Sequence, residues 1–306
     1  MKKLALQPDA QDEGQRLDLF LAAKGSLTRG EARRLLDRGA VWVNGQRVKI
    51  ASKAVHQGQH VLVVQEESGR TEPALRELGR DRVLYEDDHL IAVDKPVGVP
   101  AQATLATDRG NLVALVSKLV GREVGLVHRL DLETSGVTVF AKTPPATTAL
   151  AGAFAHGTAH KRYLAVAVGA LPDEGRIDLA ISPDSRRWGK YRAMAGGKVT
   201  AATRFRVLAR REGLSAVELF PETGRTHQIR VHLKALGAPI AGDDLYGGPQ
   251  QGGSPEGRWH AGRVMLHARS LEIPHPATGA LLRVEAPVPD DLRDLLVAAG
   301  ADPKAL

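Results

Sequence analysis

Apolar positions in the first 65 residues recur with the periods of two short helices and a small sheet. Residues 1–13 are mostly polar and carry charges of both signs, so we predict a polar tail there. Residues 16–23 place apolar side chains at i, i+3 and i+4, which predicts an amphipathic helix. A second helix is predicted over residues 29–38, because Thr28 and Glu31 have the spacing of a capping box and a glycine follows the last turn.

A hairpin is predicted directly after the second helix. Residues 41–43 are β-branched or aromatic, and the following Asn44-Gly45 is a strong signal for a tight turn. Residues 61–64 predict a closing strand of the same sheet. The composition then changes to Glu, Arg, Ser, Gly and Pro over residues 66–81, and we interpret this stretch as a linker between two modules.

The remaining chain predicts a larger module with more strands than helices. The expected strands are residues 83–85, 90–93, 137–141, 163–168, 203–210 and 215–220, of which the last two form a hairpin. The expected helices are residues 111–120, 144–157, 226–237 and 290–299, with Thr226 and Asp290 as the caps of the last two. Strands joined by short turns favour an α+β fold on a mixed, largely antiparallel sheet.

Composition and charge narrow the functional classes. The 306 residues fit two domains, and the absence of cysteine excludes disulfides, thiol nucleophiles and cysteine-ligated metal centres. No apolar leader segment and no run of 18 apolar residues occur, so we expect a cytoplasmic protein without a membrane partner. The net charge is +7, and residues 16–49 carry eight basic side chains against three acidic ones. This concentration of positive charge favours a polyanionic partner.

The basic helix and the hairpin that follows it form a recognisable unit. The sequence Thr28-Arg-Gly-Glu-Ala-Arg-Arg-Leu-Leu, followed by Gly39-Ala-Val-Trp-Val-Asn-Gly, resembles the S4 RNA-binding domain. Arg29 and Arg33 lie one turn apart with Arg34 beside them, so we expect these three side chains to bind RNA phosphates. The alternative is a basic helix face that contacts only solvent.

The segment with the most specific chemistry is Gly125-Leu-Val-His-Arg-Leu-Asp-Leu-Glu-Thr-Ser-Gly-Val137. It resembles the signature of the RluA-type RNA pseudouridine synthases, which isomerise uridine within RNA. Further segments that match this family, in the same order, are Tyr85–His89, Val93–Pro96, Lys161–Tyr163, Thr223–His232, Pro239–Asp243 and Tyr246–Gly247. The resemblance spans residues 82–290 and implies an enzyme that needs no cofactor.

The resemblance assigns the catalytic carboxylate to Asp131 and its salt-bridge partner to Arg230. An arginine beside an aspartate stabilises the ionised carboxylate, and its planar fork can bind both oxygens. Arg225 is the weaker candidate for this partner, with a structural role in the Thr-Gly turn as its alternative. The sequence leaves open whether Asp131 attacks the sugar, attacks the base or removes the 2′ proton.

Three further side chains are assigned to the substrate by the same resemblance. Tyr163 is expected to stack on the flipped uracil and to relay the C5 proton through its hydroxyl. Ile229 is expected to line the base pocket, with packing in a helix core beside Leu233 and Leu236 as the alternative. Arg129 is expected to fill the space that the flipped uridine leaves in the RNA. His128 is expected to cap its loop or contact RNA, without a part in catalysis.

Other arrangements of reactive residues do not form a site. His156 and His160 are separated by Gly157 and lack the glutamate of a zinc-binding helix, and no phosphate-binding glycine motif occurs. Asp131 and Glu133 are too close on one loop to flank a glycosidic bond. We therefore expect no metal, no organic cofactor and no nucleotide cofactor.

These observations predict an S4-like RNA-binding domain over residues 13–66 and a pseudouridine synthase domain over residues 82–306. The expected substrate is structured RNA, with 23S ribosomal RNA as the first candidate, and the expected oligomeric state is a monomer. The alternatives are a tRNA pseudouridine synthase and a catalytically inert RNA-binding or ribosome-assembly protein of the same fold. A nucleoside hydrolase is more remote, since it would leave the S4-like module without a purpose.

Overall fold

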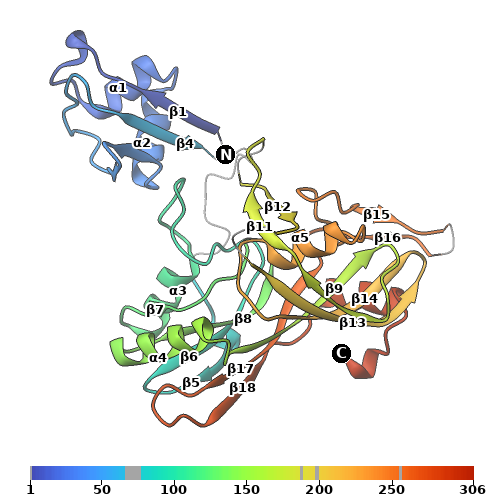
Figure 1. Cartoon of the computed structure of the whole chain (residues 1–306). Helices are drawn as coiled ribbons and strands as arrows, with labels where there is room; N and C mark the ends of the chain where they lie inside the picture. Colours follow the sequence, from blue (N-terminus) through green and yellow to red (C-terminus); the bar gives the residue numbers. More distant parts are fainter. Residues whose placement is uncertain (1, 66–76, 187–188, 197–199, 255–256) are drawn as a thin grey trace. The chain divides into compact units, whose positions relative to one another are not determined.

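The computed structural model describes residues 2–65, 77–186, 189–196, 200–254 and 257–306. The chain forms two compact units, which Figure 1 shows with the helices and strands of each. The first unit contains Met1–Glu77 together with Pro100–Val116, and the second contains Leu78–Val99 and Ser117–Leu306. Most of the predicted linker, residues 66–76, lies outside the described residues.

The first unit packs two helices against a four-stranded antiparallel sheet. The helices are α1 (Leu17–Lys24) and α2 (Arg29–Asp37). The strands, in their order across the sheet, are β1 (Lys2–Leu6), β4 (Val61–Gln65), β2 (Val41–Val43) and β3 (Gln46–Arg47). The predicted polar tail is therefore wrong over residues 2–6. Leu4 and Leu6 alternate with exposed positions and pack on the hydrophobic core, which makes this segment an edge strand.

Local signals in the first unit are confirmed. The Thr28 hydroxyl accepts a hydrogen bond from the Glu31 backbone N–H, and the Glu31 carboxylate accepts one from the Thr28 N–H, which completes the predicted capping box. Asn44 and Gly45 both have positive φ, at 50° and 76°, as a tight hairpin turn between β2 and β3 requires. The segment 100–116 also packs within this unit, where Trp42 donates from Nε1 to the Leu105 carbonyl at 2.9 Å.

The second unit is built on one large sheet. Its strands, in order, are β10 (Glu174–Asp178), β13 (Ala202–Arg211), β14 (Leu214–Pro221), β9 (His160–Val168), β17 (Leu266–Pro274), β8 (Ser135–Ala141), β6 (Leu90–Lys95) and β5 (Val83–Glu86). Two further strands, β18 (Leu281–Glu285) and β7 (Gly125–Leu126), pair with β17 and β8. Among the described strands of this sheet only β17 and β8 run parallel, so the predicted α+β class with a mixed, largely antiparallel sheet is confirmed.

The central strand β17 joins the two halves of this sheet, and the sequence pattern did not predict it. Residues 266–274 are mostly buried, including the polar side chains of His267 and Ser270. Polar residues on a strand that is covered on both faces remove the alternation by which a strand is recognised. The small hairpins β11 (Ala180–Pro183) with β12 (Tyr191–Met194) and β15 (Gln251–Gly252) with β16 (Trp259–His260) were also not predicted.

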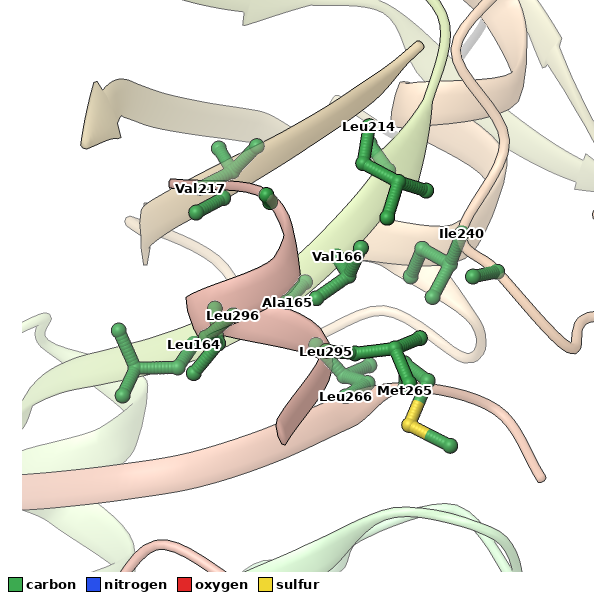
Figure 2. Close-up of a cluster of buried hydrophobic side chains, with 14 of the residues drawn as sticks. Leu164, Ala165, Val166, Leu214, Val217, Ile240, Met265, Leu266, Leu295 and Leu296 are labelled. Carbon is green, nitrogen blue, oxygen red and sulfur yellow. The ribbon is translucent and has the colours of Figure 1, made fainter. Parts of the chain in front are cut away.

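Four longer helices are α3 (Leu112–Val120), α4 (Pro144–Ala155), α5 (Gln228–Ala235) and α6 (Asp290–Ala298). In Figure 2, Leu295 and Leu296 of α6 are part of the largest hydrophobic cluster, together with side chains of β9 and β14. Two predicted caps are wrong. The N-cap of α5 is His227 rather than Thr226, with φ 57° and no side-chain cap, and the N-cap of α6 is Pro289 rather than Asp290.

Candidate active site

One cavity of the second unit gathers the five site residues that the sequence assigned to this module. Its volume is about 670 Å³, within the range of small-molecule sites. Arg129 and Asp131 come from the loop between β7 and β8, Tyr163 comes from β9, and Ile229 and Arg230 come from α5. Residues separated by up to a hundred positions in the sequence therefore face the same space.

Lys95 anchors the loop that carries Asp131 through hydrogen bonds to backbone carbonyls. The Lys95 side chain is fully buried, and its ammonium donates to the carbonyls of Pro96, Leu132 and Thr134 at 3.0, 3.2 and 2.8 Å. Burial lowers the pKa of Lys95 to about 7. The backbone N–H of Gly98 also donates to the Leu132 carbonyl, at 2.9 Å. These bonds fix the part of the loop that directly follows residue 131.

Gly136 allows the same loop to enter the sheet. It has φ 111°, and a Cβ at this position would lie 2.2 Å from the backbone oxygen of Ala268 on β17. The parallel pairing of β8 with β17 therefore requires glycine here. This requirement explains the glycine of the Thr-Ser-Gly segment in physical terms.

Arg230 lies between two carboxylates. Its Nε and Nη2 donate to the two oxygens of Asp243 at 2.7 and 2.8 Å, and its Nη1 is 3.5 Å from Oδ2 of Asp131. The planar fork was expected to bind Asp131, but it binds Asp243 instead, and Asp131 receives only the remaining nitrogen. The ring of Tyr246 lies 5.1 Å from the guanidinium carbon, close enough for a cation–π contact.

Arg225 has a different environment. Its Nε donates to the Thr200 carbonyl at 3.3 Å, and its backbone N–H donates to the Gln228 side chain at 3.0 Å. Gln228 also accepts from the Thr223 hydroxyl, at 2.7 Å. These contacts agree with the alternative in which Arg225 belongs to the Thr-Gly turn.

The aromatic and apolar walls of the cavity come from Tyr163 and Ile229. Burial, together with the negative charge of Asp131, raises the pKa of Tyr163, so its phenol stays protonated at neutral pH. Ile229 lines the cavity and also belongs to the largest hydrophobic cluster, so its packing in a core is confirmed and its contact with the base stays a prediction. Leu236, its expected partner in a helix core, is 41% exposed, and that part of the prediction is wrong.

Two residues of the His-Arg-Leu-Asp segment have distinct positions. The Arg129 side chain is exposed and donates from Nη2 to the Thr226 hydroxyl at 3.2 Å. His128 accepts a hydrogen bond from the Val139 backbone N–H at 2.9 Å and stacks on Phe154. Burial lowers the pKa of His128 to about 3, so it is a neutral structural side chain that ties the loop to β8.

The sequence interpretation missed the residues that hold the site together. Lys95, Asp243 and Tyr246 all lie in segments that matched the family, but no role was assigned to them there. The cavity wall also includes His227, whose Nδ1 is 2.8 Å from the Tyr246 hydroxyl. The family-like spacing of these segments was the only signal that could have found them, because their contacts are distant in sequence.

In the first unit, Asp18 organises the predicted RNA-binding arginines. The Asp18 carboxylate is fully buried and accepts from the Nε of Arg29 at 3.1 Å and of Arg33 at 3.0 Å. Hydrogen bonds from Arg16, and then from Arg33 and Arg29, hold the pKa of Asp18 well below its usual range. Both bonds use Nε, so the terminal nitrogens of Arg29 and Arg33 keep donors for a second partner. Arg34 follows on the same helix.

Comparison with known proteins identifies both units. The family model described as S4 domain matches residues 15–61, and the model described as RNA pseudouridylate synthase matches residues 89–235. A ribosomal large subunit pseudouridine synthase D from Xanthomonas campestris is 40% identical over 236 residues, which cover 72% of this chain and 70% of the relative. The chain belongs to the RluA-type RNA pseudouridine synthases.

Two further relatives extend this match over almost the whole synthase. A ribosomal large subunit pseudouridine synthase D from Xylella fastidiosa is 36% identical and covers 94% of this chain and 90% of its own length. An uncharacterized RNA pseudouridine synthase, YlyB, from Bacillus subtilis is 34% identical, with coverages of 97% and 98%. The predicted family, the S4 domain and the RNA pseudouridine synthase activity are thereby confirmed.

Solved structures agree with the fold of the synthase. Human RNA pseudouridylate synthase domain containing 4 matches with a TM-score of 0.56 and 26% identity, covering 72% of this chain and 93% of its own. Human RNA pseudouridylate synthase domain containing 1 matches with a TM-score of 0.54 and 27% identity, with coverages of 74% and 98%. Among the described residues of the synthase, no helix is both long and apolar enough to cross a membrane.

Proposed function

We propose that this synthase converts a uridine of large-subunit ribosomal RNA to pseudouridine, with Asp131 as its essential carboxylate. The observation that carries the proposal is the placement of Asp131 in a cavity beside Tyr163 and the buried Arg230–Asp243 pair. The substrate class rests on the relatives, which are named for the large ribosomal subunit. A tRNA substrate is the second candidate.

The reaction needs one well-placed carboxylate. The N1–C1′ bond of uridine breaks, a C5–C1′ bond forms, the C5 proton leaves, and N1 carries a proton in the product. Asp131 acts at the sugar, at the base or at the 2′ proton, and each route requires its ionised form. Arg230 places a positive charge 3.5 Å from the Asp131 carboxylate, and the neutral Tyr163 ring provides a surface on which the flipped uracil stacks.

The remaining assignments form part of the same proposal. Arg129 fills the space that the flipped uridine leaves, and Ile229 contacts the base. Arg29, Arg33 and Arg34 bind phosphates of the RNA, with the first two oriented by Asp18. The S4-like RNA-binding domain extends over residues 13–66, with β1 added to its sheet, and the synthase domain extends over residues 82–306, of which segment 100–116 packs within the first unit. The enzyme acts in the cytoplasm as a monomer without a cofactor.

The test of Asp131 is its replacement by asparagine. Asp131→Asn keeps the shape of the side chain but removes its negative charge, so we expect no detectable product while RNA binding stays within about threefold of wild type. Glu133→Gln is the matched control, because Glu133 is an exposed carboxylate on the same loop. Turnover of Asp131→Asn within tenfold of the wild-type rate would disprove the assignment.

The test of the substrate is a chemical map of pseudouridine in RNA from cells with and without the gene. We expect at least one site in the large-subunit ribosomal RNA to disappear with the gene and to return with the wild-type copy but not with Asp131→Asn. Loss of tRNA sites alone would establish the second candidate. An unchanged map in all RNA would instead support the inert RNA-binding protein.

A further inference from the structure

Lys161 is a charged side chain of the cavity to which neither the sequence interpretation nor the proposed reaction gives a role. It lies on β9 two positions before Tyr163, and side chains at i and i+2 of a strand point to the same face. Both residues line the cavity. Their backbones are about 6.6 Å apart along the strand, so the ammonium lies beside the aromatic ring along the cavity wall.

The ammonium of Lys161 has few partners within the protein. It donates to the Thr223 carbonyl at 2.8 Å, which uses one of its three N–H groups. Within the part of the chain that the structure describes, no carboxylate lies within ion-pair distance of Lys161. Burial lowers the pKa of Lys161 to about 8, so the site stabilises its positive charge less well than water does. A cation in such a position is stabilised when a ligand supplies the missing negative charge.

The two carboxylates of the cavity wall do not supply the negative charge that Lys161 lacks, because both have arginine partners. Asp131 is beside Arg230, and Glu222 accepts from Arg176 and Arg204 at 3.0 Å each. The space next to the ammonium is also open. Gly224 faces it without a side chain, and a Cβ added there would lie 3.7 Å from Nζ. An anion of the substrate can therefore reach Lys161 from the cavity.

We propose that Lys161 binds a phosphodiester that flanks the target uridine and so positions the flipped nucleotide against Tyr163. The only anionic groups that an RNA substrate brings are its phosphodiesters, and a lysine binds them as a compact point charge. The base lies on the tyrosine, the ribose bridges the two residues, and the phosphate meets the ammonium. The proposal rests on the uridine-isomerising activity and extends it to a second anchoring point.

The experiment combines protein variants with RNAs that lack one charge. The RNA is a fragment that the wild-type enzyme modifies, prepared with all natural linkages or with a single uncharged methylphosphonate on the 5′ or the 3′ side of the target. Single-turnover rates at increasing enzyme concentration give the half-saturating concentration and the maximal rate separately. The proteins are wild type, Lys161→Met, Lys161→Arg and, as a lysine outside the cavity, Lys304→Met.

With wild type and Lys304→Met, we expect one of the two neutral linkages to raise the half-saturating concentration roughly 10- to 100-fold. Lys161→Met should show a similar increase on natural RNA and no further increase with that neutral linkage. Lys161→Arg, which keeps the charge, should stay nearer to wild type. The slope of log affinity against log salt should fall by about one for Lys161→Met.

Two outcomes overturn the inference while the enzyme remains active. If neither neutral linkage weakens binding by wild type, no phosphate is bound in the way proposed. If Lys161→Met loses activity but keeps the full penalty of the neutral linkage, Lys161 only supports the Thr223 turn. Both results leave the isomerase activity itself untouched, because they are measured on RNA that wild type modifies.

Discussion

Arg230 and Asp243 form a buried ion pair with two short hydrogen bonds, and this pair fixes the arginine beside Asp131. The bonds measure 2.7 and 2.8 Å, whereas the contact from Arg230 to Asp131 measures 3.5 Å. The stronger pairing is thus with a residue that does not line the cavity. Arg230 is held in place by Asp243, and its remaining nitrogen acts on the carboxylate that faces the substrate.

Replacing Arg230 should therefore damage both stability and activity. Arg230→Met leaves the fully buried Asp243 without its cationic partner, and we expect the free energy of unfolding to fall by about 3–5 kcal/mol. Product formation should be lost near neutral pH. Arg230→Lys keeps the charge without the fork and should fall between Met and wild type. Denaturant unfolding and single-turnover rates measure the two effects. An inactive Arg225→Met beside a nearly wild-type Arg230→Met would place the critical arginine at position 225.

Asp243→Asn tests whether the anchor matters for the reaction. The substitution leaves every cavity-lining side chain intact but removes the charge that orients Arg230, so we expect a 10- to 100-fold slower single turnover, by roughly 1.4–2.7 kcal/mol. RNA affinity should change little, since Asp243 is buried. Asp244→Asn, at the exposed neighbouring position, is the matched control. Equal rates for the two variants would contradict the anchoring role.

Lys95→Met tests the support under the Asp131 loop. It removes a donor from three carbonyls in a buried site. The Leu132 carbonyl keeps the Gly98 N–H, and each carbonyl that is left without a donor costs about 1–3 kcal/mol. We expect a lower unfolding free energy and, in the fraction that remains folded, a slower maximal rate because Asp131 is no longer held. Thermal unfolding measures the loss of stability, and the maximal rate per folded enzyme molecule measures the loss of activity. A folded Lys95→Met with the wild-type maximal rate would show that the loop keeps its position without the lysine.

His267 should make the stability of the enzyme depend on pH. It is fully buried, with Nδ1 at 2.9 Å from the Ser135 hydroxyl, and burial lowers its pKa from 6.5 to about 4. Between these two values the unfolded chain binds a proton at this residue and the folded protein does not, so unfolding becomes easier as the pH falls. The expected loss from pH 6.5 to 4 is roughly 3 kcal/mol.

The matching measurement is denaturant unfolding across this pH range. His267→Gln should reduce the pH dependence by the equivalent of one proton, whereas His156→Gln, at an exposed position, should leave it unchanged. A wild-type stability that rises as the pH falls from 6.5 to 4 would contradict the assignment.

The arginines of α2 should bind RNA without regard to its sequence. We expect each of three single variants to weaken RNA binding by a similar factor for all RNA sequences: Arg29→Gln, Arg33→Gln and Arg34→Gln. Each should also lower the slope of log affinity against log salt concentration by about one. Point substitutions are cleaner than removal of the S4 domain, because segment 100–116 packs in the same unit and would lose its partners. Filter binding at several salt concentrations measures the slopes. Three unchanged slopes would mean that this helix face contacts only solvent.

Sequence reasoning succeeded where the signal is local. The capping box of Thr28 and the Asn44-Gly45 turn depend on neighbouring residues, and both are present as predicted. It failed where distant segments decide the structure. The ion pair of Arg230 with Asp243 and the strand β17 depend on partners that no periodicity reveals. The cap of α5 is a third case, since His227 adopts positive φ there instead of the expected Thr226 cap.

The position of β17 also determines when this enzyme can first work during its own synthesis. Asp131 precedes β8 and Tyr163 lies on β9, and these two strands are held together in the sheet by β17, which is made much later (Figure 1). A nascent chain on the ribosome therefore carries both residues long before the strand between their elements exists. Such non-local pairing is slow and leaves strand edges exposed until it is complete. The cavity of an emerging chain therefore stays unassembled until β17 has been made and has left the ribosome.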